Sequence, residues 1–200
     1  DLATQAVIDM KCYVNYYHKG TFKDQLVYKE QEVNVDLDLA HLKKLNAPIK
    51  LKIEKDGNQY LVTGSYYIPV DAFSSQKEPV KIEKTLASLP ASINTRVGTL
   101  HFTQNGKYAL KDGESLKVII VSPEMAAKGY TKALAVSQTS KTTTIAELVL
   151  KDEDPQRSID YLNTLIKVYN RQANEDKNEI SFRTEQFINQ RLEKINNELG

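Results

Sequence analysis

The sequence contains one cysteine, no tryptophan and no long apolar run. A lone thiol excludes an internal disulfide and a site with several thiolate ligands. Cys12 stands among strand-forming residues, so we predict that it is buried and inert. The missing disulfides suit a cytosolic and a periplasmic protein equally well. No stretch reaches the roughly 18 apolar residues of a membrane-spanning helix.

The chain also lacks an excess of charge of either sign. Lysine and arginine total 27, against 26 for aspartate and glutamate. A nucleic-acid-binding surface normally needs a basic excess, so we predict no nucleic-acid partner. With 40% hydrophobic residues the chain is long enough to bury a proper core.

Catalytic motifs are missing as well. Gly106 and Gly113 are isolated turn glycines rather than parts of a phosphate-binding loop, and no serine stands in a Gly-x-Ser-x-Gly turn. His18, His41 and His101 lie far apart without ligand-spaced companions. The acidic run at 151–154 lacks the spaced oxygen ligands of a calcium loop. We therefore predict no enzyme activity, cofactor or metal site in this segment.

The first three quarters of the chain read as strands with a few helices. Apolar and polar residues alternate at 33–37 and 49–54, and Asp56-Gly57 separates two such runs as in a hairpin. We expect Pro69, Pro79 and Pro90 at sheet edges or in loops. Ser122 should cap a helix at 123–132, the helix at 2–10 has no clear cap, 22–28 suits a helical turn, and 74–77 suits a loop. Expected strands are 12–17, 33–37, 49–54, 59–63, 66–70, 80–84, 98–103, 116–121, 134–137 and 143–150.

These elements predict an α+β fold, in which helices back a mixed sheet with a β-rich insertion and a long C-terminal amphipathic helix follows. We expect four parts. Residues 1–47 and 116–153 form the two portions of an α+β base, 48–115 form the β-rich subdomain, and 154–200 form the long helix.

The long helix is the most informative feature. Asp154 suits its N-cap and Pro155 its first position, and 46 residues would extend about 70 Å. An apolar stripe this regular predicts a partner helix or chain, and we expect the natural protein to continue beyond Gly200. The first four stripe residues should pack the helix root on the base, and the others should meet another helix or a neighbouring subunit. The stripe comprises Ile159, Leu162, Ile166, Tyr169, Ile180, Phe187, Leu192, Ile195 and Leu199.

Tyrosine is the abundant aromatic residue. Tyr60, Tyr66 and Tyr67 lie in the β-rich part and suit stacking on sugar rings, but tyrosines equally fill strands and interfaces. Both interpretations stay open from the sequence.

Two segments carry a family resemblance. DPQRSIDYLNTLIKVYN at 154–170 and FINQRL at 187–192 follow one another as in the Wzz-like chain-length determinants, the polysaccharide co-polymerases. Members that carry a tyrosine autokinase look closest. The region from Gly129-Tyr130 to Leu150 also resembles the stretch before that helix, whereas the β-rich middle resembles it least.

The resemblance implies the periplasmic portion of a bacterial inner-membrane protein, with membrane helices outside residues 1–200 and any kinase in a separate cytoplasmic domain. It implies a homo-oligomeric scaffold that controls the chain length and export of capsular, exo- or O-antigen polysaccharide, beside a polymerase and an outer-membrane exporter. The membrane would be reached only through segments outside this chain. Two alternatives remain: a polysaccharide-binding module, and an export adaptor whose coiled coil docks another envelope component.

Overall fold

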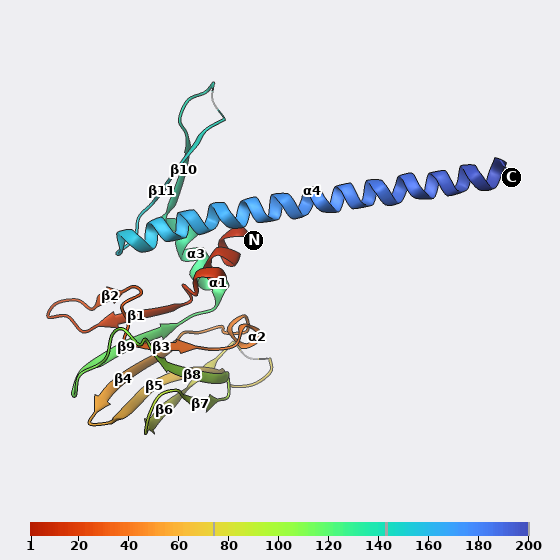
Figure 1. The fold of residues 1–200 in the computed structure, drawn as a ribbon. Helices are drawn as coiled ribbons and strands as arrows, with labels where there is room; N and C mark the ends of the chain where they lie inside the picture. The colour runs from red at the N-terminus through yellow and green to blue at the C-terminus, as the bar shows by residue number, and fades with distance from the viewer. Residues whose placement is uncertain (74, 143, 200) are drawn as a thin grey trace.

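The computed structural model describes residues 1–73, 75–142 and 144–199 and confirms the α+β class (Figure 1). Only the backbone of residue 199 is described. Residues 74, 143 and 200, which include parts of the predicted loop at 74–77 and the predicted strand at 143–150, lie outside the described residues. The elements are α1 (Leu2–Met10), β1 (Val14–His18), β2 (Gln25–Val27), β3 (Val33–Asp36), α2 (Leu39–Leu42), β4 (Ile49–Asp56), β5 (Gln59–Pro69), β6 (Lys77–Leu86), β7 (Ala91–Thr95), β8 (Gly98–Gln104), β9 (Ser115–Ile120), α3 (Pro123–Ala133), β10 (Leu134–Gln138), β11 (Ala146–Leu150) and α4 (Pro155–Leu199).

The larger sheet has six strands in the order β2-β1-β9-β4-β5-β6. Alternation along β4 explains its two faces, because Ile49, Leu51 and Ile53 are buried while Lys50 and Lys52 are exposed. The sheet joins strands from 1–47, 48–115 and 115–120, so it is continuous across these ranges.

The expected mixed pairing is corrected by the structure: every strand pair between described residues is antiparallel. β9 lies between β1 and β4 and runs antiparallel to both. The ends of the segment therefore meet in the sheet without the crossover that a parallel pair requires.

A second sheet, β3-β8-β7, shares one core with the first. Leu100 and Phe102 of β8 are fully buried together with Val118 and Ile120 of β9. Tyr16 links β1 to β3, because its hydroxyl accepts from Val35 N at 2.9 Å and donates to Val35 O at 3.3 Å.

The hairpin prediction at Gly57 is confirmed. Gly57 adopts φ +59° between β4 and β5, where a positive φ favours glycine. Pro79 lies in the edge strand β6, as expected of a residue that cannot donate to a ladder.

Two local predictions were wrong. The suggested helical turn at 22–28 contains the strand β2, because the outer edge of β1 offers its backbone groups to Gln25–Val27. The first helix does have a cap, since the Asp1 side chain accepts from Thr4 N at 2.8 Å.

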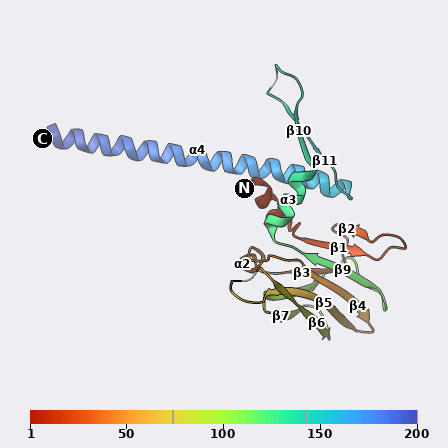
Figure 2. The same cartoon turned by 180° about the vertical axis from the view of Figure 1, so that it is seen from behind.

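Above the sheets lies a helical layer of α1, α3 and the first turns of α4 (Figure 1). α4 crosses α1 and α3 and then leaves the base altogether, which both views make plain (Figures 1 and 2). The β10–β11 hairpin rises beside the beginning of α4, on the side away from the sheets. The helix α4 and the β10–β11 hairpin therefore both project from the base.

Candidate interaction site on the projecting helix

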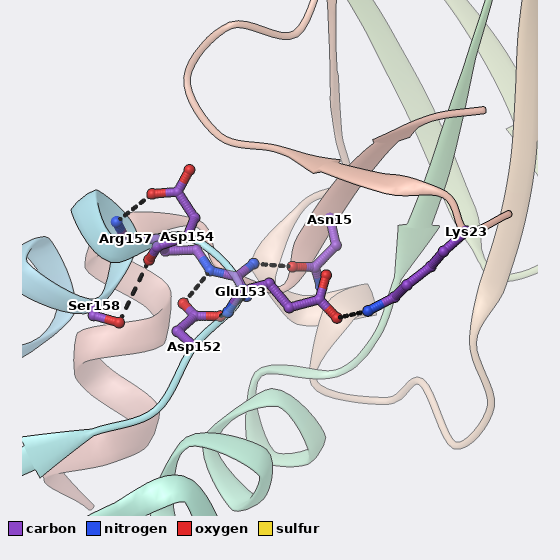
Figure 3. A network of polar contacts seen from close by, with 7 residues as sticks. All are labelled: Asn15, Lys23, Asp152, Glu153, Asp154, Arg157 and Ser158. Atoms are coloured by element: carbon purple, nitrogen blue, oxygen red, sulfur yellow. Dashed lines mark hydrogen bonds and ion pairs between the residues drawn. The ribbon is translucent and has the colours of Figure 1, made fainter. Parts of the chain in front are cut away.

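α4 begins where the sequence predicts. The Asp154 carboxylate accepts from Arg157 N at 2.9 Å, and Pro155 occupies the first helical position (Figure 3). The Ser158 amide donates to Asp154 O at 3.1 Å. The N-cap prediction is confirmed.

A part-buried ion pair anchors this end of the helix. Arg157 donates to both carboxylate oxygens of Asp152, from Nε at 2.6 Å and Nη2 at 2.5 Å (Figure 3). The two side chains are only 14% and 7% exposed. Arg157 Nη1 also donates to Asn15 Oδ1 of β1 at 2.9 Å. A bidentate pair of this kind fixes orientation as well as distance.

Aromatic packing continues the attachment. Tyr161 is buried and stacks on Tyr130 of α3, with ring centroids 4.2 Å apart and an interplanar angle of 10°. Val168, two turns later, is fully buried. Cys12 is buried in the same region, and burial raises the pKa of its thiol. The prediction that Cys12 is buried is confirmed.

Asp160 forms a second polar attachment at the rim of the base. It accepts from the Tyr28 hydroxyl at 2.5 Å, from Lys29 Nζ at 2.9 Å and from Gln156 Nε2 at 2.9 Å. These bonds favour the carboxylate and lower the pKa of Asp160 to about 2. Burial, followed by the bond to this carboxylate, raises the pKa of Tyr28.

The face of α4 that packs on the base differs from the predicted one. The prediction that the first four stripe residues pack the root was wrong for Ile159, Ile166 and Tyr169, which are 52%, 47% and 59% exposed, while Leu162 is half-buried. At about 100° per residue, Ile159 and Ile166 lie roughly 140–160° around the helix from Tyr161. The root therefore has two apolar faces, one against the base and one open.

The rest of the predicted stripe is open too. Ile180, Phe187, Leu192 and Ile195 are between 49% and 65% exposed, and all side chains from 174 to 198 are exposed. The side chain of Leu199 lies outside the described part of the chain. The role of these exposed residues in an interface stays a prediction, which their lack of cover by any described residue motivates. Ile188, which belongs to the FINQRL motif, is also exposed, and so is Phe182, which the sequence analysis did not single out.

The three candidate sugar-stacking tyrosines do not share a surface. Tyr60 and Tyr66 are each 5% exposed, so their rings belong to the core and offer no stacking face. Their hydroxyls accept from Gln104 Nε2 and Arg96 N, each at 3.2 Å. Tyr67 alone of the three is substantially exposed, because successive residues of β5 point to opposite faces.

The histidines each have a nearby side-chain partner: Glu32 for His18, Asp38 for His41 and Ser92 for His101. Within the described ranges no three His, Cys, Asp or Glu side chains are placed to hold a metal ion. The candidate site is therefore a surface for association, defined by the open apolar face of α4.

No protein-family model and no curated protein sequence matches this chain. Among the helices of the described residues, none is both long and apolar enough to cross a membrane.

Proposed function

We propose that this chain is the periplasmic scaffold domain of a Wzz-like polysaccharide co-polymerase, which controls polysaccharide chain length and export. The observation that carries the proposal is the open apolar face of α4 between Ile159 and Ile195, on a helix whose other face is anchored to the base. The segments at 154–170 and 187–192 that carry the resemblance lie on this same helix.

The proposed mechanism is geometric. α4 is about 70 Å long by its rise per residue, and its root is held by Arg157, Tyr161 and Val168. The part of α4 beyond the root, residues 174–198, is called the rod. Because the root is anchored, the rod keeps a defined direction from the base. Its open face would pack against a helix of another subunit, because a long apolar stripe is stabilised by burial against a similar one. Several subunits would then form a cage beside the polymerase and exporter.

The test uses the full-length protein in the membrane. Leu192→Glu with Ile195→Glu places two charges in the open face, and we expect loss of the oligomer and an altered polysaccharide length distribution. Cross-linking in membranes measures the first effect, and gel electrophoresis of the polysaccharide measures the second.

A matched control adds the same charge to the opposite side of the rod. Gln190→Glu with Asn197→Glu changes two exposed polar residues within the same two turns. We expect this variant to keep the oligomer and the wild-type length distribution. A monomeric wild-type protein, or equal behaviour of the two variants, would remove the scaffold proposal.

A further inference from the structure

A groove of about 840 Å³ runs between the root of α4 and the base. Its walls come from α1, β1, the β2–β3 connection, β3, β8 and α4. Volumes of about 300–1,000 Å³ are typical of sites for small ligands. The scaffold role of α4 does not use this groove.

Uncharged polar side chains line the groove on both walls. Gln31 precedes β3 and Asn34 lies in it. Thr103 lies on β8, and Asn163 lies on α4. Thr103 and Asn163 are exposed, and Gln31 and Asn34 are half-buried. Gln31 Nε2 donates to Asn34 Oδ1 at 2.9 Å and so positions the Asn34 amide at the wall, while Gln31 Oε1 is buried behind it. Amides and hydroxyls both donate and accept, so they suit a ligand with many hydroxyl groups.

Charges along the groove are largely neutralised within the protein. Lys11 pairs with Asp36 at 2.7 Å, Lys29 with Asp160 at 2.9 Å, and Arg157 with Asp152. Lys167 adds one exposed cation at the α4 wall. A paired set of charges gives little attraction for a polyanion, which favours an uncharged ligand.

The groove is a poor site for an extended peptide. A peptide gains affinity by pairing with a free strand edge and by filling apolar pockets. At β3 the backbone N–H and C=O of Val35 are already bonded to the Tyr16 hydroxyl.

The half-buried ring of Tyr28 lies at the wall, and an aromatic ring can pack on the apolar face of a sugar.

We infer that this groove binds a short segment of an uncharged saccharide, rich in hydroxyl and amide groups. The ligand lies between Asn34 and Thr103 on one side and Asn163 on the other, and Gln31 positions Asn34. This site goes beyond the scaffold role, because oligomerisation through the open face of α4 needs no affinity for sugar.

The first experiment is a titration of the 200-residue chain followed by amide chemical shifts. The probes are triacetylchitotriose, maltotriose and trigalacturonate, which are neutral with amides, neutral without amides and acidic. We expect saturable shifts at Asn34, Thr103 and Asn163 with a neutral probe and weaker binding of trigalacturonate. Failure of both neutral probes to bind at about 10 mM, the weak end of specific affinities, overturns the inference, and so does preference for the acidic probe.

Paired variants then localise the binding. Asn163→Ala with Lys167→Ala removes two exposed groove residues from α4, and we expect about tenfold weaker binding of the neutral probe. Asn174→Ala with Lys177→Ala makes the same changes on the rod outside the groove and should leave binding unchanged. Equal effects of the two variants overturn the assignment. Membrane cross-linking of Leu192→Glu with Ile195→Glu tests the scaffold separately, so the two proposals fail independently.

Discussion

The root and the rod of α4 belong to one helix but have opposite surroundings. The root, residues 155–173, buries Tyr161 and Val168 and shares a part-buried ion pair with Asp152. The rod, residues 174–198, has only exposed side chains, and its Arg183–Glu179 pair is exposed as well. Local hydrogen bonds suffice to continue a helix once it is nucleated. Direction and attachment, by contrast, come from tertiary contacts at the root.

The comparison also separates two uses of apolar residues. Tyr161 faces the base and stabilises the fold of this chain, whereas Ile166 and Ile195 are 47% and 49% exposed and leave much of their apolar surface uncovered. Exposed apolar side chains in a continuous stripe are typical of an interaction surface.

The largest expected effect is on the root. Tyr161→Ala removes a fully buried ring and its stacking on Tyr130, and we expect the free energy of unfolding to fall by about 3–5 kcal/mol. Urea denaturation measures the difference. Tyr169→Ala, an exposed tyrosine two turns along, should change it by less than about 0.5 kcal/mol. Similar losses in the two variants would contradict the assigned faces.

The second prediction concerns the ion pairs. Asp152→Ala leaves the part-buried Arg157 guanidinium without its counter-charge, and we expect a loss of about 2 kcal/mol in the free energy of unfolding. Glu179→Ala removes one partner of the exposed pair in the rod and should cost less than about 0.5 kcal/mol. Urea denaturation measures both losses. Equal losses in the free energy of unfolding for the two variants would contradict the stronger attachment at the root.

The third prediction is a dependence on pH. The pKa of Asp160 is about 2 in the folded chain, below the value of about 3.9 for an unfolded aspartate. Its bonds to Tyr28, Lys29 and Gln156 therefore stabilise the fold above pH 4, and this stabilisation is lost as the pH falls from about 4 to about 2. Asp160→Asn should lower stability at neutral pH by about 1 kcal/mol and flatten this part of the stability curve. An unchanged curve between pH 2 and 4 would refute the assignment.

The smallest expected effect comes from shortening the rod. Removing residues 176–200 deletes no buried side chain of the described part, so the free energy of unfolding should change by less than about 0.5 kcal/mol. Urea denaturation of the shortened and complete chains is the measurement. A loss above about 1 kcal/mol would mean that the rod folds against the base.

Several elements were predictable because their signals are local. Asp154 caps α4 and Ser122 caps α3, since each side chain reaches an amide three residues ahead. Alternation along β4 and the positive φ of Gly57 identify the hairpin from neighbouring residues alone.

Other features depend on segments far apart in the sequence. β2 is a strand because β1 lies beside it, and the pairing of β1 with β9 joins residues about one hundred positions apart. The groove combines Asn34, Thr103 and Asn163, which have no common motif. The buried Tyr60 and Tyr66 were indistinguishable by sequence from the exposed Tyr67 as candidate sugar platforms.

The amino-acid order by itself determined that residues 155–199 form a helix with an apolar stripe, because capping and a period of 3.6 residues are properties of neighbouring residues. Which face of that helix is buried depends instead on packing between distant segments. Tyr161 and Val168 meet α1, α3 and the base across long sequence separations, and this packing turns Ile159 and Ile166 outward. The apolar stripe therefore follows from the order of the residues, whereas its exposure to a partner follows from the packing of α4 on the base.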